Sequence, residues 1–149
     1  MSRVTEVLVH QHRRVIALLD QTQENPKAHV LESLADEIVG HTFAEAELVY
    51  PNRLVSRGSQ AQALEEHAVL QFALQRLLAA NPGNVAFEAR LRALRELVVH
   101  HLEREERARL PHVERQIGVR RSRELAKRVA SRFDELVALG HRSALRRRT

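Results

Sequence analysis

The chain has 149 residues, of which 44% are hydrophobic and 29% are charged, with a formal net charge of +5 at pH 7. That length suits one domain with a sizeable core and is short for two, so residues 1–149 are predicted to form a single domain. The lack of cysteine excludes disulfides, thiolate metal sites and thiol nucleophiles. Without an apolar run of 18 residues or a signal-peptide pattern at the N-terminus, we expect a cytoplasmic protein that does not enter a membrane.

Four amphipathic segments of similar length follow one another, separated by short stretches that contain proline or glycine. In each segment the apolar residues recur at alternating steps of three and four, the pattern of a helix that faces a bundle core. Four long helices with short loops predict an all-α fold, an up-down-up-down four-helix bundle over about residues 4–112. The predicted helices cover residues 4–22, 28–50, 60–80 and 84–110.

A fifth amphipathic segment, at about residues 120–141, predicts an additional C-terminal helix packed on the outside of the bundle. Residues 142–149 are expected to form a basic tail. Of the 24 lysines and arginines, 14 lie in residues 101–149. Such a charge bias is usually a solvated surface, and with no tryptophan and one tyrosine available for base stacking, nucleic-acid binding is not expected.

Ionisable side chains interrupt the apolar stripes. Each of the four predicted helices carries one histidine on its core-facing stripe, and the second and fourth helices also carry a glutamate. Burying such groups without partners costs free energy, so six of them on core stripes need one shared explanation. These residues are His12, His41, Glu45, His67, His101 and Glu105.

The segments HTFAEAELVYP (41–51) and HLEREERARLP (101–111) repeat one frame: a histidine, a glutamate four residues later and a proline ten residues later. Positions i and i+4 share a helix face, so each pair can point at one object. Imidazole and carboxylate together suit iron, zinc or manganese. Two carboxylates that can bridge favour two metal ions over one. The stripes should continue to Leu48 and Ala108, and Pro51 and Pro111 should end their helices.

These motifs resemble those of the hemerythrin-like, or HHE cation-binding, family over about residues 5–112. HRRVIALL (12–19) is similar to the first-helix motif, the two HxxxE frames to the paired motifs, and EEHAVL (65–70) to the third-helix motif. The fifth segment resembles the C-terminal extension of actinobacterial-type members. The resemblance implies a four-helix bundle around a non-haem di-iron centre.

Carried over residue by residue, the resemblance makes the six stripe residues the iron ligands. Glu45 and Glu105 would bridge the two iron ions, and an oxo or hydroxo group would be the third bridge.

The chain departs from the pattern of oxygen-carrying hemerythrins, which have a second histidine where this chain has Gln71 and His-x4-Asp where it has His101 and Glu105. Four histidines, two bridging carboxylates and an oxo bridge leave two of twelve coordination positions open. Iron ions with open coordination positions favour reaction with peroxide, nitric oxide or oxygen over reversible oxygen storage. A fifth protein ligand would remove that argument. Tyr50, whose position before Pro51 makes ideal helix angles unreliable, is the candidate.

Other polar residues near the frames could support the metal ligands. Glu66 is a candidate hydrogen-bond partner for a metal-bound histidine, and His100 is a boundary residue that could serve in the same way. Glu47 and Glu106 are expected to be solvated. Surface positions are expected for His10, His29 and His141, and a loop position is expected for His112, which follows the helix-ending Pro111.

The leading hypothesis is therefore a di-iron protein that reacts with hydrogen peroxide in a catalase-like manner, or with nitric oxide or oxygen. The alternative is an oxygen-binding or iron-sensing module without turnover. A third reading, nucleic-acid binding through residues 104–148, is weaker. The sequence leaves open whether the protein is a monomer or a dimer, and which oxidant, redox partner and metal it uses.

Overall fold

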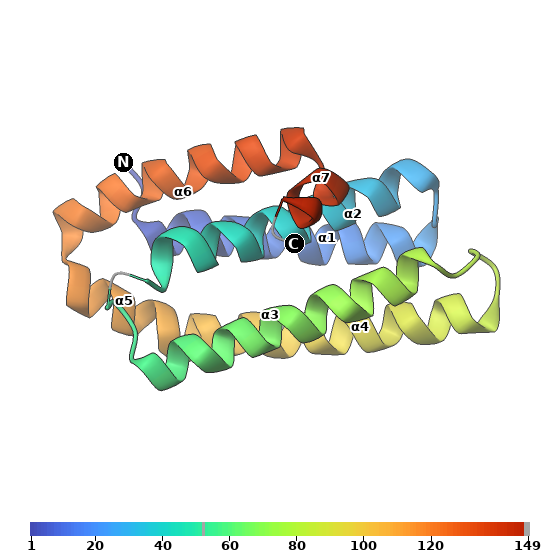
Figure 1. The fold of residues 1–149 in the computed structure, drawn as a ribbon, viewed down its shortest axis with the longest axis horizontal. Helices are drawn as coiled ribbons and strands as arrows, with labels where there is room; N and C mark the ends of the chain where they lie inside the picture. Colours follow the sequence, from blue (N-terminus) through green and yellow to red (C-terminus); the bar gives the residue numbers. More distant parts are fainter. Residues whose placement is uncertain (52, 148–149) are drawn as a thin grey trace.

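The computed structural model describes residues 1–51 and 53–147, which contain helices and no strand. Four long helices form an antiparallel bundle in which two helical hairpins lie side by side (Figure 1). The predicted all-α fold, an up-down-up-down four-helix bundle with an additional C-terminal helix, is confirmed. The four bundle helices are α1 (Val4–Glu24), α2 (Ala28–Ala44), α3 (Arg57–Leu78) and α4 (Val85–Arg104).

The bundle is held together by the apolar stripes that the sequence predicts. Leu8, Leu34, Leu74 and Leu94, one from each helix, are at most 1% exposed. Burying a leucine side chain contributes roughly 1.5–3 kcal/mol, so these layers supply much of the driving force for folding. The stripe histidines occupy the same faces and are carried into the interior with their apolar neighbours.

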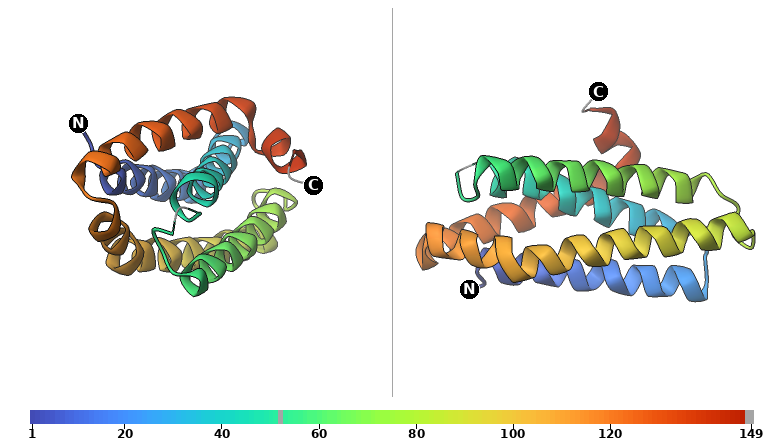
Figure 2. Two further views of the ribbon diagram at one scale, coloured as in Figure 1. Left: turned by 60° about the vertical axis from the view of Figure 1, so that its left-hand side comes forward. Right: turned by 90° about the horizontal axis from the view of Figure 1, so that it is seen from below.

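A second layer covers one side of the bundle. After α4 the chain continues through a short α5 (Leu110–Ile117), turns at Gly118 and returns as α6 (Val119–Leu139). Gly118 has φ +78°, a left-handed conformation that glycine adopts without a steric penalty. Helix α6 packs across α1 and α2 (Figure 2), so it lies on the outside of the bundle as expected.

The expected basic tail is partly a packed helix. Residues His141–Arg146 form α7, which lies against α2, whereas residues 148–149 fall outside the described residues. The prediction that His141 lies on the surface is wrong, since it is 4% exposed. Its backbone N–H and its Nδ1 both donate to Asp36 Oδ1, at 2.9 and 2.7 Å. Asp36 therefore caps the start of α7, and Arg142 pairs with Glu32 beside it at 2.6 Å.

Both repeated frames leave the α-helical path at their glutamate. Residues Glu45–Val49 and Glu105–Arg109 form π-helical turns, η1 and η2. In η1 the N–H of Tyr50 donates to the carbonyl of Glu45, five residues back, at 3.1 Å. A π-turn inserts one residue into a helical turn and is common at functional sites. It also changes which later residues face the core.

That inserted residue corrects two expectations about the stripes. Leu48 is half-buried and Ala108 is exposed, whereas Val49 and Arg109 take the buried positions one residue later. Pro111 does not end its helix, because the chain remains helical to Ile117 with the proline in the first turn of α5, where its missing N–H is tolerated. Pro51 does follow the end of its helix. In the described part of the chain, no helix combines the length and apolar character needed to cross a membrane.

Helix α6 packs closely on α2 at Gly40. A Cβ atom at this position would lie 3.2 Å from Val137 and 3.3 Å from Phe133. We expect Gly40→Leu to destabilise the protein by about 1–3 kcal/mol through overpacking. The measurement is urea unfolding followed by circular dichroism. Gly58→Leu is the matched control, because a Cβ at Gly58 meets nothing within 4 Å. Equal stability of the two variants would contradict the inferred contact.

Candidate metal centre

Each bundle helix delivers one histidine to the interior at the same level of the bundle. His12 comes from α1, His41 from α2, His67 from α3 and His101 from α4, and all four are 1–4% exposed. The two glutamates, Glu45 and Glu105, are 0% exposed and begin η1 and η2. The structure thus brings together all six residues that the sequence singled out.

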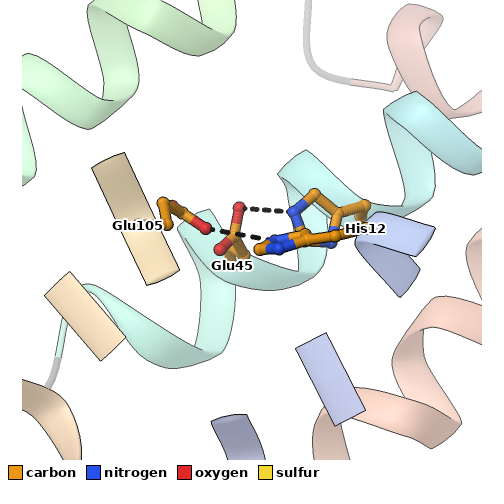
Figure 3. Close-up of side chains that lie close together, drawn as sticks. His12, Glu45 and Glu105 are labelled. Atoms are coloured by element: carbon orange, nitrogen blue, oxygen red, sulfur yellow. Dashed lines mark ion pairs between the residues drawn. The ribbon is translucent and has the colours of Figure 1, made fainter. Parts of the chain in front are cut away.

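The six residues form two overlapping groups, each able to surround one metal ion. His12 and His41 form the first group with Glu45 and Glu105, and His67 and His101 form the second with the same two glutamates. Within each group the candidate ligand atoms lie within 4.8 Å of one another. The shared carboxylates lie between two pairs of imidazoles. Figure 3 shows His12, Glu45 and Glu105 converging from different helical segments.

The oxygen atoms of Glu105 are divided between the two groups. Oε2 lies 3.5 Å from Nε2 of His12, and Oε1 lies 3.5 Å from Nε2 of His101. Glu45 Oε1 lies 3.0 Å from Nε2 of His41 and 3.4 Å from Nε2 of His67. Each carboxylate therefore faces a histidine of both groups, which is the arrangement that a bridging ligand requires.

The buried polar atoms at the centre are left without hydrogen bonds in the described part of the chain. They are Nε2 of His12, His41 and His101, both carboxylate oxygens of Glu45, and Oε2 of Glu105. Leaving a buried polar group without a partner costs about 1–3 kcal/mol each. Cations coordinated by these lone pairs would remove that penalty. The donor set of imidazole nitrogen and carboxylate oxygen suits iron, manganese or zinc, so the residues fit a metal centre.

The other ring nitrogen of three histidines is engaged by a side chain outside the cluster. Nδ1 of His101 donates to Glu66 Oε1 at 2.7 Å, and Nδ1 of His12 donates to Glu106 Oε2 at 3.2 Å. Gln11 supplies the third acceptor through Oε1, at 2.8 Å from Nδ1 of His41. A proton held on Nδ1 leaves the Nε2 lone pair free for a metal, as is usual for metal-bound histidines.

Glu66 is itself held by two arginines. Arg109 donates to both of its oxygens at 3.0 and 3.1 Å, and Arg104 donates to Oε2 at 2.9 Å. Arg109 is 5% exposed and its Nη1 lies 3.9 Å from Glu105 Oε1. A bidentate arginine fixes the plane of a carboxylate, so this network sets the orientation of the His101 ring.

Tyr50 points into the cluster. It is 1% exposed, its hydroxyl donates to Glu105 Oε1, and the hydroxyl oxygen lies 3.5 Å from Nε2 of His67. An ideal α-helix would direct Tyr50 away from Glu45. The π-turn places the fifth residue after Glu45 on the same face, so Tyr50 reaches the second group.

Electrostatics keeps the Glu45 carboxylate ionised. Burial raises the pKa of Glu45, but His41, Glu105 and His101 outweigh burial and hold that pKa well below its usual value. Burial lowers the pKa of His101, yet the neighbouring carboxylates of Glu45, Glu66 and Glu105 raise it overall to about 10. Burial, then the nearby carboxylates, raise the pKa of Tyr50 well above its usual value. A carboxylate that stays ionised, as Glu45 does, is what cation binding needs.

The sequence predicts only some of the residues that hydrogen-bond to the cluster histidines. Glu66 does accept a hydrogen bond from a cluster histidine. That histidine is His101 on α4 and not His67, its neighbour in the sequence. His100 is exposed and accepts a hydrogen bond from Arg104 at 2.8 Å, and among the described residues it has no hydrogen bond to the cluster itself, so its supporting role stays a prediction. In the described part of the chain Gln71 makes no hydrogen bond to the cluster either.

Sequence reasoning assigned no role to two supporting residues and undervalued a third. Gln11 and Arg109 were missed, and Glu106 was expected to be solvated, yet it bonds His12 while its side chain remains 42% exposed. Glu106 directly follows a cluster glutamate and Gln11 directly precedes a cluster histidine, which is a weak signal. The buried position of Arg109 can be predicted only when the π-turn is known. Exposed positions are confirmed for His10 and His29, whereas the predicted loop position of His112 is wrong, because this half-buried residue lies in α5.

A four-helix bundle that encloses four imidazoles and two shared carboxylates defines a metal-binding protein of the histidine and carboxylate class. The family model for the hemerythrin HHE cation binding domain matches residues 3–113. The chain therefore belongs to the hemerythrin HHE cation-binding family. Comparisons with curated proteins and with solved structures gave no match.

The hydrogen bond from His101 to Glu66 should tune metal affinity. We expect Glu66→Gln to weaken metal binding about 10–100-fold, because a neutral amide supports the imidazole less well than a carboxylate does. Competition with a chelator measures the affinity. The control is Glu65→Gln, which changes the exposed neighbour of Glu66. Unchanged affinity in Glu66→Gln would show that the network has no influence on the metal.

Proposed function

We propose that the cluster holds two iron ions and that the protein reacts with small oxidants, most favourably hydrogen peroxide in a catalase-like manner. The observation that carries this proposal is the pair of overlapping four-residue groups with both glutamates in common. Six residues arranged in this way would supply two histidines to each of two ions and two carboxylates to both. His12 and His41 would hold one iron, His67 and His101 the other, and Glu45 and Glu105 would bridge them together with an oxo or hydroxo group.

The two proposed iron positions differ in their protein surroundings. Tyr50 reaches the position of His67 and His101, where its hydroxyl would be a fifth protein ligand or a hydrogen-bond donor to Glu105. If Tyr50 were a ligand, it would occupy the side of His67 and His101, so the oxidant would react on the side that His12 and His41 would hold.

A cavity of about 360 Å³ adjoins that side of the cluster. His12 forms part of its wall, and its other lining residues between α1 and α4 include Ile16, Val99 and Leu102. Apolar walls favour a small ligand with no net charge, such as hydrogen peroxide, nitric oxide or oxygen, over a charged one. Glu106 also lines this cavity and bonds Nδ1 of His12.

In the catalase-like reaction, one peroxide molecule is reduced to two water molecules while a second is oxidised to dioxygen, with two protons and two electrons passing between them. Iron supplies the redox chemistry. The side chains supply the rest: Glu106 can accept and return a proton at the cavity wall because its carboxylate is partly exposed. The Tyr50 O–H holds a proton on the opposite side against Glu105.

We further propose that the protein works in the cytoplasm, with the small oxidant as its partner and without nucleic acid. The apolar cavity beside His12 supports a neutral oxidant. The pairing of Arg132 with Glu47 and of Arg142 with Glu32 supports a structural role for these C-terminal arginines.

The proposal is tested by adding peroxide to the iron-loaded protein and following oxygen release. We expect about two irons per chain, because the cluster offers two positions that share both glutamates. We also expect sustained oxygen release. Glu45→Ala and His101→Ala should lose iron and activity, because each removes ligands from the cluster. His29→Ala, an exposed position, is the control.

Full activity in the Glu45→Ala and His101→Ala variants would exclude the proposed centre. If peroxide bleached the visible spectrum once and no oxygen were released, the protein would have a sensing or binding role and would not catalyse turnover.

The role of Tyr50 can be read from the visible spectrum. If its phenolate coordinates iron, the loaded protein should show a phenolate-to-iron charge-transfer band, and Tyr50→Phe should abolish that band while iron content is retained. Leu54→Ala, a change at a buried apolar position on the same loop, is a control for general disturbance. A spectrum that is identical in Tyr50→Phe would limit Tyr50 to its hydrogen bond with Glu105.

A further inference from the structure

A second, chemically different cavity lies at the end of the bundle where α3 begins. It has a volume of about 360 Å³ and lies between the first turn of α3 and the segment formed by η2 and α5. Figure 1 shows these segments at the same end of the molecule. Its polar lining residues are Ser56, Ser59, Arg107, Arg109, His112 and Arg115.

The lining of this cavity carries positive charge that is only partly compensated, because Arg109 is paired with Glu66 whereas Arg107 and Arg115 have no such partner among the described residues. Three of its side chains are arginines, which remain protonated at any physiological pH, and none is a carboxylate. Over residues 1–51 and 53–147, no carboxylate lies within 4.0 Å of the guanidinium groups of Arg107 or Arg115. By contrast, the arginines at positions 14, 132 and 142 are paired with glutamates at 2.6–2.7 Å.

The first turn of α3 adds positive potential of its own. The N-terminus of a helix carries a partial positive charge and has N–H groups without helical acceptors. Ser56 caps one of them by accepting from Ser59 N at 3.1 Å, and the first turn contains no acidic residue. A Cβ at Gly58 would meet nothing within 4 Å, so the backbone here is open to approach.

Arg109 is the buried member of the cavity. It is 5% exposed, and its Nε atom has no hydrogen-bond partner over residues 1–51 and 53–147. Both of its terminal nitrogens donate to Glu66. Glu66 accepts from His101. The cavity is thus linked by three side chains to the metal centre.

Positively charged side chains that lie close together around a small cavity repel one another unless an anion is bound between them. Guanidinium groups, serine hydroxyls and free N–H groups at a helix start are the donors that bind phosphate. We infer that this cavity is a binding site for a small oxyanion of the phosphate class, either free phosphate or the terminal group of a phosphate monoester. Bound there, the anion contacts Arg107 and Arg115 and acts on the metal centre through Arg109.

The experiment is calorimetric titration of the full-length, iron-loaded protein with inorganic phosphate, with a phosphate monoester as a second probe. We expect saturable binding of one phosphate per chain in the millimolar range or tighter. Arg107→Gln combined with Arg115→Gln should weaken it by at least about tenfold, because charge-assisted hydrogen bonds to the anion are lost. Both arginines are exposed, so the variant should fold normally.

The matched control combines Arg121→Gln with Arg123→Gln, two exposed arginines on α6 that lie outside the cavity. It removes the same net charge and should leave phosphate affinity unchanged. Preference for the monoester over free phosphate would identify a larger ligand that carries the same group. Equal weakening in both double variants, no saturable binding, or binding that survives in Arg107→Gln/Arg115→Gln because it occurs at iron, would overturn the inference.

Discussion

The structure depends on the burial of two carboxylates between four imidazoles. Glu45 and Glu105 are completely enclosed, and each faces histidines of both groups. Such a cluster would be costly inside an apolar bundle without a compensating cation, because most of its central polar atoms have no hydrogen-bond partner in the described residues. The bundle can hold this cluster because each helix contributes only one or two of the six groups, and apolar layers on either side provide the stabilisation.

The π-turns connect the repeated frames with the surroundings of the centre. An α-helix would place Ala108 inside and Arg109 at the boundary, and it would turn Tyr50 away. The inserted residue instead directs Tyr50 towards Glu105 and brings Arg109 against Glu66. One local change of backbone geometry, made twice, therefore supplies a candidate fifth ligand on one frame and an orienting cation on the other.

The surroundings of the centre are asymmetric, and the asymmetry has functional meaning. The side held by His12 and His41 adjoins an apolar cavity and is supported by Glu106 and Gln11. The opposite side is occupied by Tyr50 and by the arginine-clamped Glu66. A neutral oxidant would approach the first side, and the basic cavity near α3 lies behind the second. This division separates the proposed reaction from the proposed anion site.

The sequence by itself determined the helical class, the four bundle helices and the six residues of the cluster. These follow from periodicity and i, i+4 spacing, which are local properties of a helix. Only the tertiary structure decided which carboxylate supports which histidine, where His141 lies and that the helix continues past Pro111. Those outcomes depend on a π-turn that shifts the register and on contacts between residues far apart in the chain. The physical reason is that helical periodicity is encoded locally, whereas partners across helices are fixed by packing.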